Sequence, residues 1–258
     1  MNSVIARKDK QGIGRITINR PAAYNALSIA CMQSLIGAFK LLSADDGVRV
    51  IVLSGAGKGF CAGHDLAEMR SKPEREFQQL TFSTCTSLML AITQSPKPVI
   101  AKVHGVATAA GCQLVASCDL AVAEENSRFA TPGVNLGLFC STPMVALSRN
   151  ISRKHAMEML LLGDFISAQR AYEMGFINYL ASTDELEKTV DALALKIASK
   201  SSLTLKVGKQ AFYQQCDKGL VDAYQHCGEV MVDNMMALDA QEGIDAFMEK
   251  RRPVWRNV

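Results

Sequence analysis

The stretch VHGVATAAGCQLVASCDLAVAEE, at residues 103–125, most constrains what this chain can fold into, because it is almost entirely apolar and rich in small residues. Together with the PVIAK run before it, it has the pattern of a buried strand that turns sharply into a buried helix. One neutral amide, Gln113, interrupts it directly after Gly111 and Cys112. Whether that amide serves catalysis or packing is the first question that the sequence raises.

The chain before residue 141 alternates strand and helix patterns. The runs SVIARK and GRITIN flank the turn-rich DKQG and predict a hairpin, and RVIVLSG predicts a further strand. Helical spacing of apolar residues predicts one helix after the N-cap Ser28 and a long one at about residues 74–94, which the prolines of SPKP end. This alternation predicts an α/β core of repeated strand-strand-helix turns.

The pattern changes after Ser141, where nearly all of the chain has helical spacing and FINYL is the one strand-like interruption. Ser182 and Glu185 stand at the spacing of a capping box, which predicts that a helix begins there. We therefore expect a core at residues 1–195 and a helical C-terminal region at residues 196–258.

Charge and hydropathy exclude several function classes. The net charge of this 258-residue chain is only +3, and no run of lysine or arginine is long enough to follow a phosphate backbone, so neither nucleic acid nor a membrane surface is expected as a partner. No window reaches the roughly 18 uninterrupted apolar residues of a membrane-spanning helix. The N-terminus lacks the apolar core of a secretory signal.

The eight cysteines form no C-x-x-C pair, and several lie inside apolar runs, where a free thiol behaves as a small hydrophobe. We expect reduced thiols in an intracellular compartment. No group of residues has the spacing of a metal site, so no metal is expected.

Two glycine-rich loops follow strands. GAGKGFCAG, at residues 55–63, fails the phosphate-loop pattern because Lys58 is followed by Gly59, and it fails G-x-G-x-x-G at Phe60. Nucleotide hydrolysis and Rossmann dehydrogenase chemistry are therefore not expected. This loop and GVATAAGC both present main-chain N–H groups, the second at a helix N-terminus, which suggests paired donors around one developing oxyanion. Close packing of small residues is the alternative explanation.

Four separated motifs, in order and over nearly the whole chain, resemble the crotonase, or enoyl-CoA hydratase/isomerase, superfamily: NRPAAYNALS, GFCAGHDLAEM, the segment that begins VHGVATAAGC, and LLLGDFISAQRAYEMGFINYL. The resemblance implies an α/β fold made of a spiral of β-β-α units, followed by a C-terminal helical trimerisation region. It also implies homotrimers or hexamers and a site for acyl-coenzyme A thioesters as ligand or substrate, with no separate cofactor.

The resemblance also implies site residues. The two oxyanion-hole N–H groups fall on Ala62 and Ala110, and both would hold the thioester oxygen as it becomes enolate-like. Coenzyme A contacts are implied for a set close to the first glycine-rich loop, namely Ala23, Tyr24, Ala62, His64, Asp65 and Leu66. The family often has a lysine near the coenzyme A phosphates where this chain has Ala22. An imidazole titrates near neutral pH, but we expect His64 to be a ligand contact and not a catalyst.

Two positions depart from the hydrating members of the superfamily. Those members use a pair of glutamates, and the corresponding positions here are Gln113 and Gly133. An amide exchanges no proton near neutral pH, and glycine has no side chain. Gln113 either holds a water or a substrate oxygen or only satisfies a neighbouring backbone group.

The resemblance implies an acyl-CoA-binding protein of mitochondrial fatty-acid metabolism, with any transit peptide absent from this chain, and the two departures predict that it lacks ordinary enoyl-CoA hydratase activity. The alternative is an active acyl-CoA lyase, isomerase or decarboxylase that uses the oxyanion hole to stabilise a thioester enolate. The segment TPGVNLG, which is similar to decarboxylases of the superfamily, supports this alternative. Whether the protein is an enzyme stays open at this point.

Overall fold

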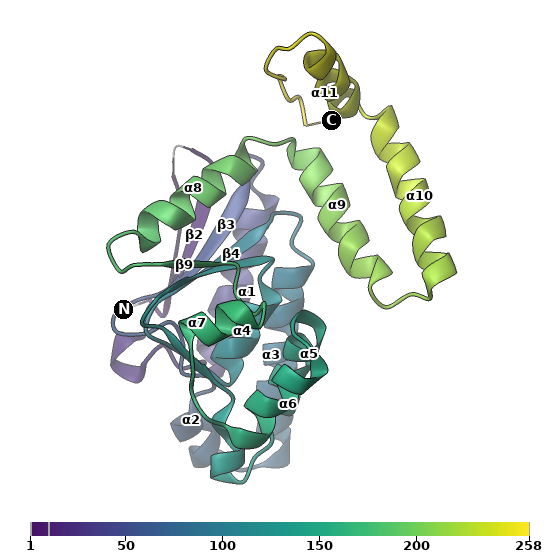
Figure 1. Cartoon of the computed structure of the whole chain (residues 1–258). Helices are drawn as coiled ribbons and strands as arrows, with labels where there is room; N and C mark the ends of the chain where they lie inside the picture. The colour runs from purple at the N-terminus through teal and green to yellow at the C-terminus, as the bar shows by residue number, and fades with distance from the viewer. Residues whose placement is uncertain (1, 10, 258) are drawn as a thin grey trace.

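A mixed sheet of six strands forms the centre of the computed structural model, which describes residues 2–9 and 11–257 (Figure 1). Its strands, in spatial order, are β1 (Val4–Lys8), β2 (Ile13–Ile18), β3 (Val50–Gly55), β4 (Val99–Val103), β6 (Leu120–Glu124) and β9 (Tyr179–Ala181). β1 and β2 are antiparallel and the other neighbours are parallel. The predicted hairpin is therefore confirmed, although Lys10 in its turn lies outside the described residues.

A smaller sheet contains β5 (Val106–Thr108), β7 (Arg128–Ala130) and β8 (Ile166–Ser167). From β4 in the large sheet the chain passes to the small sheet through β5, and then into helix α4 (Ala110–Ser117). β6 and β7 repeat this step before the short 3-10 helix η2 (Pro132–Leu136). In this part of the chain each strand pair adds one strand to each sheet before a helix follows, which agrees with the predicted β-β-α pattern.

Helices cover both faces of the large sheet because its central strands are apolar on both sides. In β3, Ile51 and Leu53 join the core cluster under α1 (Ile29–Ala44) and α3 (Arg75–Thr93). Val50 and Val52 belong to a second cluster under α8 (Leu186–Ala198). Successive side chains of a strand point to opposite faces, so one continuous apolar run supplies two cores.

The remaining helices of the body are η1 (Pro21–Ala23), α2 (Leu66–Ser71), α5 (Ser141–Asn150), α6 (Arg153–Leu162) and α7 (Ala168–Glu173). The N-cap predicted at Ser28 is confirmed, since its hydroxyl accepts from the N–H of Cys31 at 3.2 Å.

The capping box predicted at Ser182 and Glu185 is wrong. α8 begins at Leu186. Ser182 accepts hydrogen bonds from the N–H groups of Glu185 and Leu186 through its backbone carbonyl oxygen and not through its hydroxyl. The Glu185 side chain turns forward and pairs with Lys188 at 3.0 Å, so it is not available to cap. The core boundary expected between residues 195 and 196 also falls inside α8, which packs on the sheet up to its end at Ala198.

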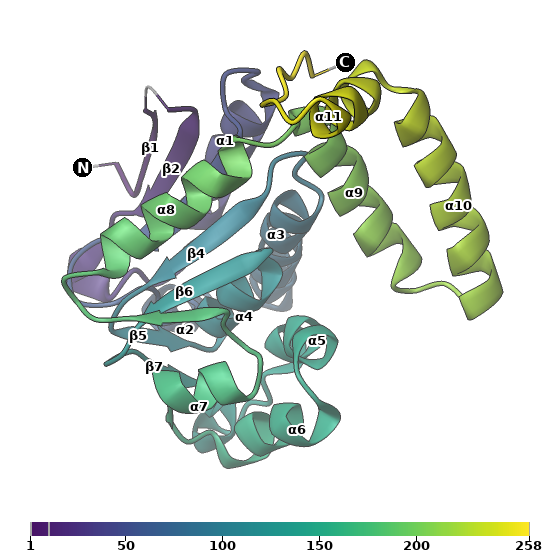
Figure 2. The same ribbon diagram turned by 45° about the horizontal axis from the view of Figure 1, so that its top comes forward.

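Three helices project from the body as an arm: α9 (Ser202–Gln215), α10 (Leu220–Met236) and α11 (Leu238–Met248), as Figure 2 shows. α9 is held to the body by Lys209, which pairs with Asp119 at 2.7 Å, and by the Tyr213 hydroxyl, which donates to the same carboxylate at 3.1 Å. No residue of α10 is buried. Among the described residues, none of the helices combines the length and the apolar character needed to cross a membrane.

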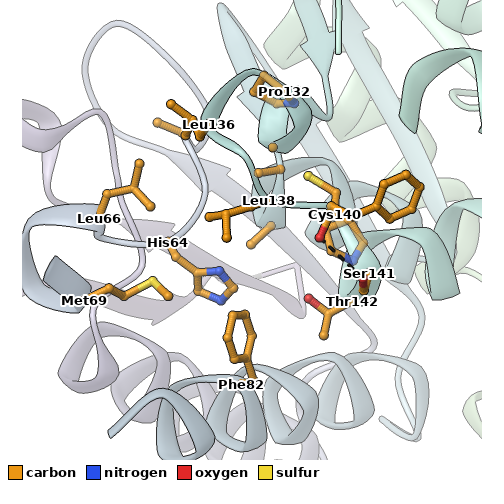
Figure 3. Close-up of a pocket in the computed structure, with 16 residues that line it drawn as sticks. His64, Leu66, Met69, Phe82, Pro132, Leu136, Leu138, Cys140, Ser141 and Thr142 are labelled. Carbon is orange, nitrogen blue, oxygen red and sulfur yellow. Dashed lines mark hydrogen bonds between the residues drawn. The ribbon is translucent and has the colours of Figure 1, made fainter. Parts of the chain in front are cut away.

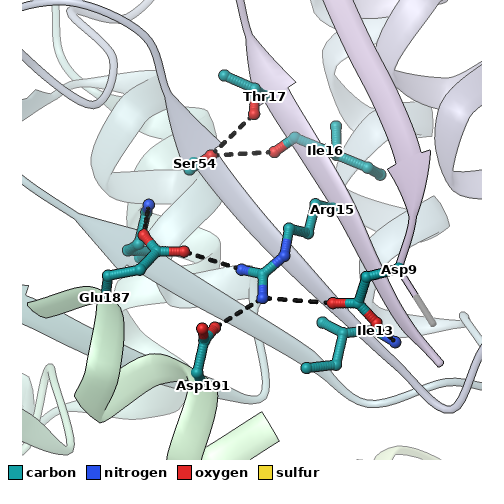
Figure 4. Close-up of polar contacts among 9 residues, drawn as sticks. Asp9, Ile13, Arg15, Ile16, Thr17, Ser54, Glu187 and Asp191 are labelled. Carbon is teal, nitrogen blue, oxygen red and sulfur yellow. Dashed lines mark hydrogen bonds and ion pairs between the residues drawn. The ribbon is translucent and has the colours of Figure 1, made fainter. Parts of the chain in front are cut away.

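An ion-pair cluster ties α8 to the large sheet (Figure 4). Arg15 of β2 contacts Asp191 at 2.7 Å and Glu187 at 3.1 Å, and Lys102 of β4 pairs with Glu187 from the other side. Partial burial alone would raise the pKa of Glu187, but the hydrogen bond and charge of Lys102, with the charge of Arg15, hold that pKa below its ordinary value.

We predict that Glu187→Gln reduces the pH dependence of stability under acid conditions. A lowered folded-state pKa stabilises the protein above the unfolded value of ~4.3, and this contribution disappears as pH falls through the folded value. The effect should stay below about 1 kcal/mol, because the Glu187 side chain is 55% exposed. Denaturant titrations of both proteins should show a difference at pH 7 that shrinks in acid, with exposed Glu76→Gln as the control. A difference that is independent of pH would contradict the prediction.

Candidate functional site

The glycine-rich loop after β3 packs directly against the start of α4. Cys61 forms an isolated bridge with Ala107, its carbonyl oxygen accepts from the Thr108 N–H at 2.9 Å, and the Thr108 hydroxyl donates to the Ala62 carbonyl at 2.9 Å. A Cβ at Gly111 would collide with the Cys61 carbonyl oxygen. Glycine at that position therefore allows the helix to begin in contact with the loop.

Ala109, just before α4, has a backbone conformation that a residue with a Cβ rarely adopts, with φ +50° and ψ −114°. It is held there because its N–H donates to the Ala130 carbonyl at 2.9 Å and its own carbonyl accepts from Gln113 at 3.1 Å. Such a conformation costs on the order of 1–3 kcal/mol. The surrounding structure thus fixes the direction in which α4 begins.

A cavity of about 370 Å³ lies beside this contact (Figure 3). It lies among α2, α3, η2 and the start of α5. Its wall is mostly apolar and consists of Ala62, His64, Leu66, Met69, Phe82, Ala109, Ala110, Pro132, Gly133, Leu136, Leu138, Phe139, Cys140, Ser141, Thr142 and Pro143. Among the described residues, no aspartate, glutamate, lysine or arginine contributes to this wall.

The cavity brings together five of the residues expected at the site, which are Ala62, His64, Leu66, Ala110 and Gly133. The others lie elsewhere. Ala23 and Tyr24 are exposed at the end of η1. Asp65 caps α2 by accepting from the Glu68 N–H at 3.1 Å, and it pairs with Arg20 at 2.8 Å.

Gln113 is buried on α4 but borders a different cavity of about 570 Å³, next to α3, α5 and α9. Its side-chain oxygen lies 3.7 Å from the thiol of Cys85, which donates a weak hydrogen bond to it. Of the two roles left open by the sequence, satisfaction of a neighbouring backbone group is not seen, because the side-chain oxygen contacts a side chain. The structure does not place the amide in the wall that holds Gly133.

One of the two main-chain N–H groups expected to be free in the wall already has a partner within the fold. The Ala62 N–H donates to the Tyr24 carbonyl oxygen at 3.0 Å, so the fold already uses it. Two other residues of the wall, His64 and Ala110, have N–H groups with no acceptor among the described residues. The Ala62 N–H expected as the first donor is therefore not free, whereas the His64 N–H, two residues later, is unpaired within the described residues. Two such N–H groups can hold one oxygen that develops negative charge.

The His64 ring stands in the wall with its edge against Phe82, at 5.4 Å between ring centroids and 86° between planes. Its Nε2 atom is buried and has no hydrogen-bond partner among the described residues. Burial lowers the pKa of His64 to about 4, so the imidazole is neutral at pH 7 and does not titrate near neutrality. This differs from the ordinary value assumed from sequence.

Several wall residues were not anticipated, among them Met69, Phe82, Leu138 and Thr142. A usable signal exists for Phe82, a large apolar residue on α3 that lies outside the buried stripe of that helix. The apolar run LGLF at residues 136–139, between two helical segments, is a second signal. Phe82 and this run both carry large apolar side chains that the main core does not cover.

Comparisons with known proteins agree on one family. The sequence profile described as Enoyl-CoA hydratase/isomerase matches residues 8–258. Enoyl-CoA hydratase domain-containing protein 3, mitochondrial, from Rattus norvegicus is 46% identical over 248 residues, which are 96% of this chain and 83% of that protein. The crystal structure of the human enoyl-CoA hydratase domain-containing protein 3 is 45% identical, with a TM-score of 0.95, and the match covers 98% of this chain and 100% of that one.

A crystal structure of an enoyl-CoA hydratase from Mycobacterium smegmatis is 49% identical, with a TM-score of 0.97 and 99% of both chains covered. The superfamily resemblance seen in the motifs and the predicted fold class are thereby confirmed.

We predict that His64 makes stability fall as the solution becomes mildly acidic. The unfolded chain protonates His64 near pH ~6.5, whereas the folded protein protonates it only near pH 4. The free energy of unfolding should therefore decrease between these values, by on the order of 2 kcal/mol. Denaturant titrations should show a shallower decrease for His64→Leu, and His155→Leu on α6 is the control. Equal slopes in all three proteins would contradict the prediction.

Proposed function

The chain belongs to the enoyl-CoA hydratase/isomerase family, and from this premise we propose that it binds acyl-CoA thioesters in the cavity of Figure 3 without ordinary enoyl-CoA hydration. The free N–H groups of His64 and Ala110 would hold the thioester oxygen. The apolar wall would hold the acyl chain, since burial of each CH₂ group is worth about 0.8 kcal/mol.

The observation that carries the proposal is the environment of Gly133. A Cβ at this position would lie 2.7 Å from the Leu138 carbonyl oxygen and 2.8 Å from the Cys140 sulfur. The Leu138 N–H also donates to the Gly133 carbonyl at 2.9 Å, which fixes the segment against it. The volume that a glutamate side chain needs at this position is therefore filled by the following loop.

Hydration needs a proton donor and acceptor near the double bond, and one positioned acid or base contributes about 10² to 10⁴ in rate. Here one of the two glutamate positions is a glycine enclosed by backbone and sulfur, and the other is an amide in contact with Cys85. Loss of both groups leaves binding and thioester polarisation as the functions that the wall supports. A role in mitochondrial fatty-acid metabolism is part of the proposal, because the rat relative is named mitochondrial.

A second candidate function is an active lyase, isomerase or decarboxylase. The two free N–H groups favour it, because oxyanion stabilisation accelerates reactions through a thioester enolate even where no carboxylate takes part. Decarboxylation differs from isomerisation in that loss of CO₂ generates the enolate without a base, although the wall offers the substrate carboxylate no counter-charge among the described residues. Release of CO₂ from malonyl-CoA or methylmalonyl-CoA would identify this activity.

We also propose that the arm, with the end of α8, forms a trimerisation region in homotrimers or hexamers. Large apolar side chains are exposed along α10 and α11, including Tyr224 at 74% and Phe247 at 84%. An apolar surface of this kind on a helix pair marks a surface for protein association. The arm is anchored to its own body at Asp119, which leaves these faces free for neighbouring copies.

We predict that the protein binds hexanoyl-CoA and crotonyl-CoA but hydrates crotonyl-CoA at least about 10²-fold more slowly than an enoyl-CoA hydratase with both glutamates. Calorimetry measures binding, and loss of the conjugated thioester absorbance measures hydration. The hydratase, assayed in parallel, is the positive control. Hydration at a rate similar to that control would contradict the proposal, as would failure to bind any acyl-CoA.

We predict that the full chain sediments as a trimer or hexamer, and that Tyr224→Asp combined with Met231→Asp shifts it to a monomer. These two residues are one α-helical heptad apart on α10 and both are exposed, so two charges would be buried without partners in an assembly. Gln225→Asp on the same helix is the matched control and should leave the assembly intact. A wild-type monomer in sedimentation would contradict this prediction.

A further inference from the structure

Two polar side chains from separate elements line the cavity, and neither has a side-chain hydrogen-bond partner in the part of the chain that the structure describes (Figure 3). His64 follows the glycine-rich loop, and its Nε2 atom has no hydrogen-bond partner among the described residues. Thr142 lies in the first turn of α5. Its neighbour Ser141 donates to the Phe139 carbonyl at 3.4 Å, whereas the Thr142 hydroxyl has no acceptor within the described part of the chain.

An unpartnered buried nitrogen has lost its hydrogen bonds to water without gaining one from the protein, which is unfavourable. The apolar residues Leu66, Met69 and Phe82 surround the imidazole and do not compensate that cost. The χ2 torsion of histidine is broad, so the ring can turn a nitrogen from Phe82 toward the cavity. A ligand that carries its own hydrogen-bonding group can therefore remove an unfavourable contact that a hydrocarbon ligand leaves in place.

The absence of charged side chains from the described wall decides which hydrogen-bonding group the ligand carries. Within the described residues, neither lysine nor arginine lines the cavity, so a carboxylate on the acyl chain would be buried without a counter-charge. A neutral imidazole offers one donor and one acceptor, and the Thr142 hydroxyl offers both as well. This set matches a neutral oxygen, either a hydroxyl or a ketone.

We propose that His64, with Thr142 opposite, makes the cavity selective for acyl-CoA thioesters whose chain carries a hydroxyl or keto oxygen beyond the third carbon. The inference rests on the proposed function, that is, on acyl-CoA binding in this cavity. The N–H proposed to hold the thioester oxygen and the imidazole belong to the same residue. Because the imidazole extends several bonds from that N–H, the recognised oxygen lies several bonds along the acyl chain from the thioester carbonyl, just beyond the third carbon.

The experiment compares four probes by calorimetry on the full-length protein: hexanoyl-CoA, 4-hydroxyhexanoyl-CoA, 5-hydroxyhexanoyl-CoA and 5-oxohexanoyl-CoA. We expect at least one oxygenated probe to bind about tenfold more tightly than hexanoyl-CoA, which is what one additional satisfied hydrogen bond provides. The hydroxy and oxo probes distinguish a ligand that donates from one that only accepts.

The readout is the ratio of the dissociation constants of the hexanoyl and oxygenated probes in each variant. His64→Leu should bring this ratio close to one, Thr142→Val should reduce it, and His64→Gln, which keeps a donor and an acceptor, should retain part of it. His155→Leu is the matched control and should keep the wild-type ratio, while circular dichroism confirms that each variant is folded.

The outcomes separate this inference from the proposed function. If wild-type protein binds hexanoyl-CoA as tightly as every oxygenated probe, or if His64→Leu keeps the preference, the selectivity is overturned while acyl-CoA binding stands. If none of the four probes binds, the proposed function fails and the selectivity fails with it.

Discussion

The contact between the Cys61 carbonyl oxygen and the backbone of Gly111 is the constraint on which the site depends. It brings the loop after β3 to the start of α4, so that His64 and Ala110, which are 46 positions apart in the sequence, line one cavity. Ala109, the residue before α4, has a strained backbone conformation, and hydrogen bonds with Ala130 and Gln113 hold it there. The stability of the spiral core offsets this local strain, which is common where a fold presents main-chain groups to a ligand.

The cavity wall contains two kinds of polar group, those that the backbone supplies and those that side chains supply. Main-chain N–H groups belong to the fold itself, so substitution of side chains leaves them in place. Carboxylates belong to side chains, and a side chain at position 133 would meet the Leu138 carbonyl oxygen and the Cys140 sulfur. One polar side chain of the wall, His64, is kept neutral by burial and is suited to hydrogen bonding more than to proton transfer.

The body and the arm differ in how their apolar side chains are packed. In the body, strands such as β3 are apolar on both faces and are covered by α1 and α3 on one side and by α8 on the other. In the arm, α10 has no buried residue, and α9 contacts the body mainly through the Lys209, Tyr213 and Asp119 cluster. The body thus has a core of its own, whereas large apolar side chains of the arm, such as Tyr224 and Phe247, are exposed.

Sequence by itself determined the α/β class, the strand-strand-helix order and the N-cap at Ser28, because these follow from short-range periodicity and turn chemistry. Its motifs also identified the loops that form the wall. Only the tertiary structure decided that the Ala62 N–H is already used by Tyr24, that Gln113 faces Cys85, and that Ser182 does not cap α8. It alone gathered His64, Phe82 and Thr142 around one cavity. The capping at Ser182 is decided locally, by the pairing of Glu185 with Lys188. The other outcomes depend on which groups approach from distant parts of the chain, and a local pattern carries no information on such partners or on the burial that sets a pKa.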